Sequence, residues 1–233
     1  MTTRPFNDET EFELALIEVL KHKGWGNMPV LNYQTEAELI RNWADRLFET
    51  NNGIDCLNGQ PLTDTEMEQI LQQVTDLRTP LNINKFVNGK TVTIRRDNPN
   101  DPNHLGKDVA LNIYDRQQIA GGKSTYQLVR QPRFNSNTTI LGNRRGDLMM
   151  LINGMPLIHI ELKKSGVPVT NATNQIERYM QEGIFSGIFS MIQVFVAMTP
   201  EETLYFANPG ADGQFNRTYF FHWADFNNEP IND

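Results

Sequence analysis

The sequence predicts one domain of the α/β (α+β) class, in which helices come first and a mostly antiparallel sheet follows. The chain has 233 residues, of which 39% are hydrophobic, and this is enough to bury a core. Apolar residues recur at helical spacing in the first third, and alternating segments between polar loops follow. Helices followed by strands are typical of a single α+β domain. We therefore expect one domain over 1–233, with a helical part at about 1–80 and a core at about 81–233.

Capping pairs and apolar stripes mark the predicted helices, and alternation or short apolar runs mark the strands. The first helix follows Asp8 and Glu11 and runs until Gly24, the second covers about 36–50, and the third opens at Thr63 with Glu66 and ends before Pro80. The predicted strands are 90–96, 125–131, 146–152, 155–164 and 192–197, and a helix at about 171–185 precedes the last of them.

Composition excludes several classes of protein. No apolar run approaches the roughly 20 residues that span a bilayer, and the N-terminus lacks the layout of a secretion signal. The single cysteine, Cys56, cannot form an internal disulfide, which fits a reducing compartment. We therefore expect a soluble, cytoplasmic protein that has no membrane partner.

The net charge of −7 is unevenly distributed along the chain, although a freestanding nucleic-acid binder is usually basic. Residues 1–78 hold 14 acidic and 6 basic side chains, and the remaining residues hold 14 and 15. Between Asp115 and Asp147 there is no acidic residue. The basic residues of that stretch are Arg116, Lys123, Arg130, Arg133, Arg144 and Arg145. It is either an ordinary solvated surface or a place where a phosphate backbone can approach, and both interpretations stay open.

Two apolar runs on either side of Asn153-Gly154 predict a β-hairpin. In the second strand the even-numbered residues form an apolar core face, so Glu161 and Lys163 point to the other face. In the first strand the even-numbered residues are also apolar, which leaves Asp147 on the odd face. If the two apolar sets share one side of the sheet, Asp147 and Glu161 share the other side.

The loop of this hairpin decides whether Asp147 and Glu161 can meet. A plain two-residue loop pairs Ile152 with Met155 and places the two acids on opposite faces, because a slip of one residue reverses every side chain. We therefore expect a three-residue loop with Gly154 in the left-handed region, or a β-bulge nearby.

Asp147, Glu161 and Lys163 together form a minimal set for metal-dependent phosphodiester hydrolysis. Two neighbouring carboxylates repel each other at pH 7 unless a cation sits between them, and hard oxygen ligands select Mg²⁺ or Mn²⁺ over zinc. The carbonyl of Leu162 offers a third oxygen. Lys163 can orient the attacking water and stabilise charge on the phosphate. The alternative is a salt bridge at a strand edge, formed by Glu161 with Lys163 or Lys164.

The segment from Arg-Arg-Gly-Asp147 through Ile-Glu161-Leu-Lys163, followed by a helix with Gln175 and Tyr179, resembles a known family. It is similar to the N-terminal nuclease domain of the R (restriction/motor) subunit of type I restriction–modification enzymes, which belongs to the PD-(D/E)XK nuclease superfamily. The resemblance implies a restriction-endonuclease-like core, with a central mixed sheet flanked by helices and extra helices at the N-terminus.

Outside that segment the likeness is weaker. The strand at 126–131 and the helix that begins with Phe12-Glu13 resemble the corresponding elements of the family. One departure lies inside the motif, at Gly146, where the family usually has proline. Glycine loosens the backbone there but removes no ligand.

The resemblance implies a role for each matching residue of the site. Asp147 and Glu161, with the Leu162 carbonyl, would bind the metal ion, and Lys163 would be the catalytic lysine. Glu13 matches a helix acid that often completes such sites.

Five further residues are candidates for supporting the site or contacting DNA. By resemblance, Gln175 and Tyr179 would do so from one face of their helix, since they lie one turn apart. Arg144 and Arg145 precede the first catalytic strand, where they suit phosphate contacts or serve as ordinary surface residues. His159 lies two residues before Glu161, within reach of a bound phosphate or packed as a structural histidine.

The resemblance implies a Mg²⁺-dependent DNA endonuclease domain that acts on foreign double-stranded DNA within a larger ATP-dependent translocating complex. Its partners would be the methyltransferase and specificity subunits. ATP would act only through a motor region, for which this chain is too short. The fragment Ala120 to Ser124 lacks the first glycine of a phosphate-binding loop, because Gln117 stands there. The alternatives are a standalone nuclease of the repair type and a catalytically inactive docking module of the same fold.

Overall fold

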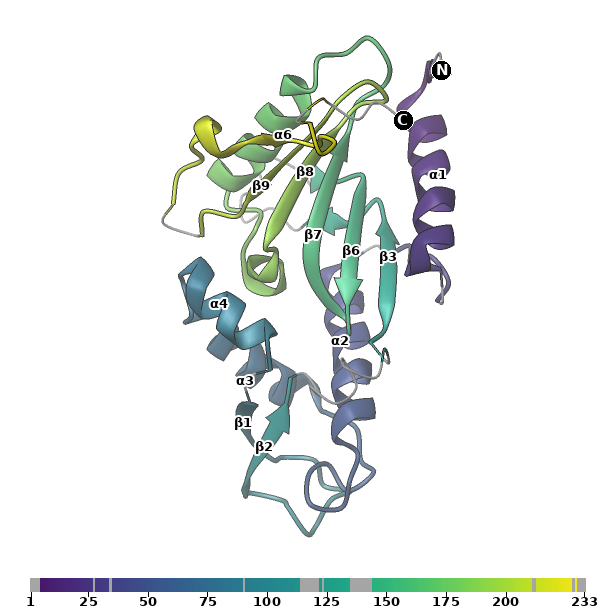
Figure 1. Cartoon of the computed structure of the whole chain (residues 1–233). Helices are drawn as coiled ribbons and strands as arrows, with labels where there is room; N and C mark the ends of the chain where they lie inside the picture. Colours follow the sequence, from purple (N-terminus) through teal and green to yellow (C-terminus); the bar gives the residue numbers. More distant parts are fainter. Residues whose placement is uncertain are drawn as a thin grey trace.

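The computed structural model describes residues 5–26, 28–33, 35–89, 91–113, 122, 124–134, 144–210, 213–227 and 229. Its centre is a six-stranded sheet with the strand order β10-β9-β8-β7-β6-β3 (Figure 1). The strands of this sheet are β3 (Tyr126–Arg130), β6 (Leu148–Ile152), β7 (Met155–Leu162), β8 (Val194–Met198), β9 (Thr203–Ala207) and β10 (Phe221–His222). Two separate pairs are β1 (Thr91–Arg95) with β2 (Asp108–Asn112), and β4 (Arg133–Phe134) with β5 (Arg144–Arg145).

Helices surround this sheet. They are α1 (Glu9–Leu20), α2 (Glu36–Asn51), α3 (Asp64–Thr75), α4 (Pro80–Val87) and α6 (Thr170–Gln181), with a π-helical turn at Lys21–Trp25 and 3₁₀ turns at Gly187–Met191 and Arg217–Tyr219. No described helix has both the length and the apolar content that a membrane crossing requires.

The sheet is mixed. Strands β7 and β8 are parallel and are connected through α6, whereas every other neighbouring pair in the sheet is antiparallel. A parallel pair needs such a crossover, because a tight turn cannot return the chain to the same end of the sheet. The α/β class with a central mixed sheet flanked by helices is therefore confirmed.

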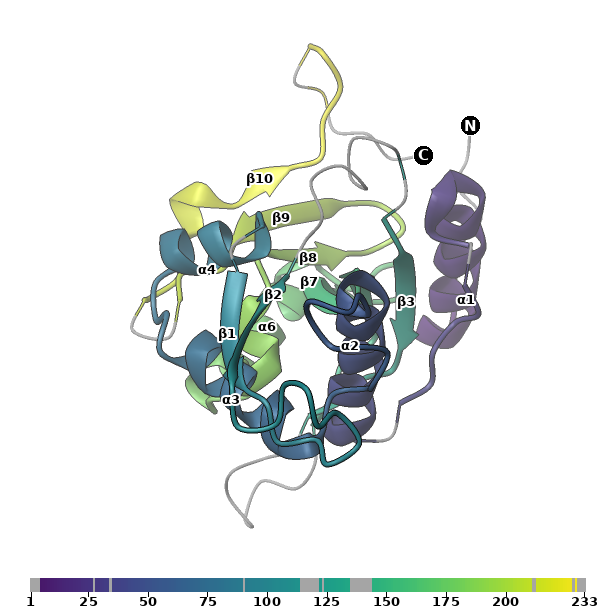
Figure 2. The ribbon, with the colours of Figure 1, turned by 90° about the horizontal axis from the view of Figure 1, so that it is seen from below.

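Both faces of the sheet are buried. Helix α1 covers one face, where Phe12 and Ile17 pack with Leu148, Ile160 and Leu162 in one apolar cluster. Helices α2 and α6 contribute to the larger cluster on the other face, and Figure 2 shows these helices and α1 on opposite sides of the sheet. The even-numbered residues of β7 form a core face as predicted, but the odd-numbered face that carries Glu161 is also enclosed. Any chemistry at Glu161 therefore takes place within the packed protein.

The β6–β7 hairpin contains the predicted bulge. Its turn has two residues, Asn153 and Gly154, both at positive φ, so the alternative of a three-residue loop is wrong. The pairing shifts between Met150 and Leu151, which leaves Leu157 of β7 as the extra residue. Beyond the bulge Leu148 pairs with Ile160, so the next position places Asp147 opposite Glu161. The bulge thus places Asp147 and Glu161 on the same face of the sheet, as the predicted register requires.

Several element boundaries differ from the prediction. The capping box of Thr63 and Glu66 is confirmed, and Asp8 caps its helix by accepting from the backbone N–H of Thr10. The helix predicted to reach residue 185 ends at Gln181, because Gly183 follows in the left-handed conformation. Helix α4 and strands β2, β4, β5, β9 and β10 were not predicted. All of them are short, and the alternation of buried and exposed residues in β2 and β9 extends over only five residues each.

A buried ionic network holds the helical part of the domain together. The guanidinium of Arg96 bonds Glu66 of α3 at 2.6 Å and Asp101 at 3.2 Å, and all three side chains are buried. It also donates to the carbonyls of Leu57 and Gln60. This network fixes the loop after β1 to α3, and nothing in the spacing of these residues had indicated it.

Candidate active site

The C-terminal end of β7 brings the predicted charged residues together. Asp147 immediately precedes β6, Glu161 is the second-last residue of β7, and Lys163 directly follows β7. The Oδ2 of Asp147 accepts a 2.7 Å hydrogen bond from the backbone N–H of Leu162. This bond holds the aspartate across the hairpin, beside the strand end that carries the glutamate and the lysine.

The fully buried Glu161 lies close to Asp147, which is half-buried. Burial and then the negative charge of Glu161 raise the pKa of Asp147 to about 7, although the Leu162 N–H and the charge of Lys163 oppose that rise. Burial likewise raises the pKa of Glu161 to about 7, against the charge of Lys163 and the hydrogen bond from Gln175. Acids with pKa values this high lack compensating positive charge, and such groups cluster at functional sites.

Lys163 supplies part of the missing positive charge. Its side chain is 14% exposed, and its Nζ donates a 2.7 Å hydrogen bond to the carbonyl of Leu162. The same Nζ lies 3.8 Å from Oε1 of Glu9, at the start of α1. The approach of Glu9 could not be predicted from spacing, because it depends on how α1 packs over the end of β7. The Lys163 side chain is therefore held between the end of β7 and the start of α1.

Two residues of α6, which the resemblance names as candidates for supporting the site or contacting DNA, lie beside Glu161. The amide Nε2 of Gln175 donates to Oε1 of Glu161 and also lies 2.8 Å from the hydroxyl of Tyr179. The Tyr179 hydroxyl donates to the carbonyl of Arg145 at 3.0 Å. Burial and the charge of Glu161 raise the pKa of Tyr179 to about 12, which keeps the hydroxyl protonated. These hydrogen bonds connect α6 to the β6–β7 hairpin and to the residues before it. Tyr179 is too buried to contact DNA directly.

Comparisons with known proteins decide the family. Residues 7–214 match the family described as the type I restriction enzyme R protein N terminus. This chain belongs to that family. The type I restriction enzyme SsaAORF53P endonuclease subunit of Staphylococcus saprophyticus is 29% identical over 231 residues, and the SauMSSORF170P subunit of Staphylococcus aureus is 27% identical over 227. The alignments cover 97% of this chain and 22% of each relative, so the chain spans about a fifth of their length.

A relative from Escherichia coli is matched over a larger share of its length. The EcoprrI endonuclease subunit is 30% identical over 238 aligned positions, which cover 99% of this chain and 68% of that protein. The R-protein N terminus is thus the part that this chain shares with endonuclease subunits from both staphylococci and E. coli.

His159 of this R-protein N terminus is fully buried, which corrects the expectation that it lies within reach of a bound phosphate. Its Nε2 lies 3.1 Å from Oε2 of Glu161, and the rings of Phe134, Phe185 and Phe195 surround it. Burial lowers the pKa of His159 to about 4, so the imidazole is neutral near pH 7. Among the described residues, the polar contact of the His159 ring is with Glu161, the candidate metal ligand.

Glu13 does not reach the metal site that it was expected to complete. Its carboxylate bonds Arg130 at 2.6 Å and Gln131 at 3.0 Å. Among the described residues, no three His, Cys, Asp or Glu side chains are grouped as a ready metal cluster. Glu13 instead holds the end of β3 against α1, and the backbone N–H of Gln131 in turn donates to the carbonyl of Asp147 at 2.8 Å.

The two arginines before Asp147 have different environments. Arg144 forms a two-pronged ion pair with Glu182, with both N–O distances at 2.8 Å, so its guanidinium is engaged within the protein. Arg145 is exposed, and its backbone carbonyl receives the Tyr179 hydroxyl. Arg116 and Lys123, also candidates for phosphate contacts, lie outside the described residues, as does most of the Ala120 to Ser124 fragment.

The donor set fits a hard divalent cation better than it fits zinc or no ion. It offers the carboxylates of Asp147 and Glu161 and the carbonyl of Leu162, and all of these are oxygen ligands. Glu161 is fully buried and Asp147 is half-buried, and the pKa of each is raised, which is the condition that a bound dication relieves. Two protein carboxylates are a typical protein contribution to a Mg²⁺ site, where waters or substrate oxygens complete the shell.

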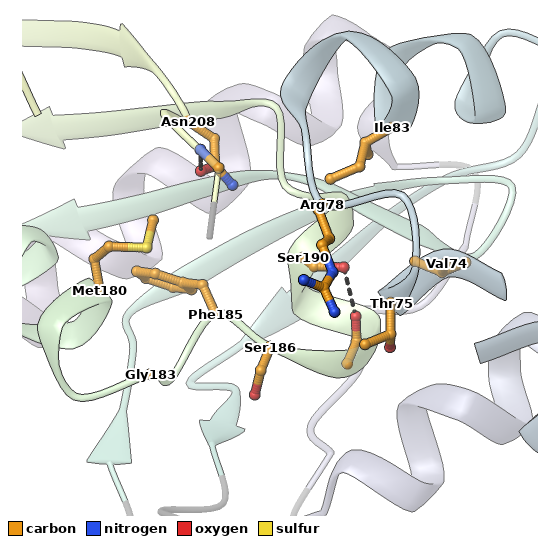
Figure 3. Close-up of a pocket in the computed structure, with 12 residues that line it drawn as sticks. Val74, Thr75, Arg78, Ile83, Met180, Gly183, Phe185, Ser186, Ser190 and Asn208 are labelled. Carbon is orange, nitrogen blue, oxygen red and sulfur yellow. Dashed lines mark hydrogen bonds between the residues drawn. The ribbon is translucent and has the colours of Figure 1, made fainter. Parts of the chain in front are cut away.

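A pocket on another part of the domain is separate from these carboxyl groups. It lies between α3, α4 and the segment that follows α6, and its lining includes Arg78, Phe185 and Ser190 (Figure 3). No acid of the candidate site lines it. The ring of Phe185 is shared by this pocket and by the surroundings of His159, so the pocket is adjacent to the site without opening into it.

Proposed function

We propose that this R-protein N terminus is a Mg²⁺-dependent DNA endonuclease domain, in which Asp147, Glu161 and Lys163 carry the reaction. The observation that carries the proposal is the convergence of three charged residues at one end of β7, where the Leu162 N–H holds Asp147 beside the fully buried Glu161 and Lys163 follows directly. The family and the names of the relatives support a nuclease role. The Mg²⁺ requirement, with Mn²⁺ as the alternative, is inferred from the oxygen ligands.

Each residue of the site has a distinct task in this proposal. Asp147, Glu161 and the Leu162 carbonyl hold the metal, which when bound lowers the pKa of its water and neutralises charge on the phosphate. The Leu162 N–H fixes Asp147, and Gln175 fixes Glu161, so both ligands are oriented before the metal arrives. Lys163 orients the attacking water and stabilises the charge that develops on the phosphate oxygens.

The substrate in this proposal is double-stranded DNA, delivered by the rest of a larger complex. The net charge of −7 disfavours strong DNA binding by the isolated domain. We infer that methyltransferase and specificity subunits and an ATP-driven motor region bring the DNA to the site, in the cytoplasm. The names of the relatives as type I restriction enzyme endonuclease subunits support this arrangement.

Two alternatives keep the same fold. A standalone PD-(D/E)XK nuclease of the repair type would use the same residues on DNA that no restriction complex delivers. An inactive docking module would keep the fold without using the acids. The raised pKa values of the adjacent Asp147 and Glu161 favour a working metal site over a docking module, because a module without chemistry gains nothing from them.

Cleavage assays with matched lysine variants test the proposal. The Lys163→Ala variant is expected to lose about a hundredfold or more of Mg²⁺-dependent DNA cleavage, since it removes a group that acts on the transition state. The control is Lys164→Ala at the exposed neighbouring position, which should cleave like the wild type. Both are measured in the complete restriction complex. Full cleavage by the Lys163→Ala variant would contradict the proposal.

A further inference from the structure

The histidine at position 159 lies in surroundings that suit an apolar side chain. It is fully buried among Phe134, Phe185 and Phe195, with ring centroids 5.7, 5.4 and 6.2 Å away. Its Nδ1 is buried and has no hydrogen-bond partner among the described residues. A buried nitrogen without a partner costs free energy that a leucine or valine would not cost. The histidine therefore needs a compensating role.

The compensating contact is with Glu161. The Nε2 of His159 lies 3.1 Å from Oε2 of Glu161. When Glu161 is ionised, as a metal ligand is, this oxygen can only accept, so Nε2 carries the proton in that state. Gln175 donates to the other oxygen, Oε1. Glu161 is thus held on both oxygens by neutral donors, which fix its orientation without cancelling its charge. That is what a metal ligand requires from the residues behind it.

The same imidazole also contacts the backbone that leads into Asp147. A Cβ atom on Gly146 would lie 2.5 Å from Cε1 of His159, and 3.1 and 3.3 Å from atoms of the Phe134 ring. Real side chains do not tolerate a 2.5 Å contact, so any residue with a Cβ at 146, including the proline that the motif usually carries, requires His159 to move. Glycine at 146 and histidine at 159 are therefore a matched pair in this chain.

We infer that His159 is a positioning residue that fixes both acids of the site, holding Glu161 through its Nε2 proton and filling the space above Gly146 next to Asp147. The inference deepens the proposed function and depends on it for the identity of the bound cation. It adds a residue that does not touch the substrate and acts only through the two carboxylates.

Metal binding measured on three proteins tests the link to Glu161. In a calorimetric titration with Mn²⁺, His159→Leu is expected to bind about 10- to 100-fold more weakly than the wild type. It should unfold at the same temperature or higher, because the unpaired Nδ1 is gone. His159→Gln, which can still donate from a terminal nitrogen, should recover most of the affinity. In cleavage assays His159→Leu should lower kcat and leave KM for DNA unchanged.

A double-mutant cycle tests the link to Gly146. Gly146→Ala alone should lower the unfolding temperature, because its methyl group collides with the imidazole. Combined with His159→Val, the same change should cost much less, since the smaller side chain leaves room. Equal losses in both backgrounds would overturn the matched pair.

The failures of the two proposals are distinguishable. A wild type that binds no Mn²⁺ would contradict the proposed function. A wild type that binds Mn²⁺, with a folded His159→Leu variant that binds it equally well, would overturn the positioning role of His159 and leave the proposed function standing. A folded His159→Gln variant that binds no better than His159→Leu would also overturn that role.

Discussion

At the scale of single residues, the proposed chemistry depends on Asp147 and Glu161, because folding places the half-buried aspartate next to the buried glutamate. Most carboxyl groups in proteins have a pKa near 4, whereas both of these have values of about 7. The fold therefore keeps two acids that would be more stable if protonated. Such a pair is costly in the metal-free protein, and binding of a divalent cation removes the cost.

This cost predicts how stability depends on pH when metal is absent. The folded state binds protons on Asp147 and Glu161 more tightly than the unfolded chain does. The free energy of unfolding in EDTA should therefore fall as pH rises from about 4 to about 7 and then level off. The loss should amount to several kcal/mol, since both acids contribute and each tenfold change in an acid constant corresponds to about 1.4 kcal/mol. Urea unfolding at a series of pH values measures it.

The control for the pH series is Asp147→Asn. This variant cannot ionise at position 147, so it also removes the negative charge next to Glu161. Its stability should change much less over the same pH range. Identical pH profiles for the variant and the wild type would show that the two acids are not destabilised by burial.

The site residues were predictable from the sequence to different degrees. Asp147, Glu161 and Lys163 followed from alternation along two strands, which is a local pattern, whereas the role of Gln175 followed only from the family resemblance. The sequence could not show that Glu13 bonds Arg130 instead, or that Phe rings enclose His159. Those contacts depend on how α1 and α6 pack on the sheet, and no spacing within one element encodes that.

At the scale of elements, the β6–β7 hairpin shows how a local irregularity sets the site. Its turn is the regular two-residue kind that Asn-Gly predicts, and that turn alone would have separated the two acids. The extra residue Leu157 restores their common face. The need for a bulge followed from the register argument, whereas its position did not, since Met155 to Leu162 carries no glycine to mark it.

The buried network of Arg96 gives a stability prediction for the helical part. Arg96→Met keeps the volume of the side chain but leaves Glu66 and Asp101 buried without their partner, so it should cost about 3–5 kcal/mol of unfolding free energy. The matched control is Arg95→Met at the exposed neighbouring position, which should cost less than about 0.5 kcal/mol. Equal unfolding midpoints in urea for the two variants would contradict the role given to this network.

At the scale of the whole molecule, the charge distribution fits the proposal that other parts of a larger complex share in DNA binding. The acidic first third cannot face a DNA backbone, and Arg144 and Arg130 are already paired with Glu182 and Glu13. The exposed Arg145 remains next to the site. The relatives from staphylococci are nearly five times as long as the stretch matched here, which leaves room for other DNA-binding parts.

The position of Arg145 predicts a salt effect on DNA binding. If Arg145 contacts one phosphate, Arg145→Ala should weaken DNA binding about equally for all sequences and reduce the slope of log affinity against log salt by about one. Arg133→Ala, at the exposed position paired with Arg145 across β4–β5, serves as the comparison. Filter binding of the complete complex at several salt concentrations measures it. An unchanged slope would remove Arg145 from the DNA interface.

Diffraction from crystals of the domain soaked in Mn²⁺, recorded at a wavelength where manganese scatters anomalously, tests the central claim most directly. The expected result is one anomalous peak within about 2.3 Å of oxygens from both Asp147 and Glu161, and no such peak in crystals of Asp147→Asn. Well-ordered carboxylates with no peak between them at saturating Mn²⁺, or a peak only elsewhere on the domain, would contradict the claim that these two acids hold the metal.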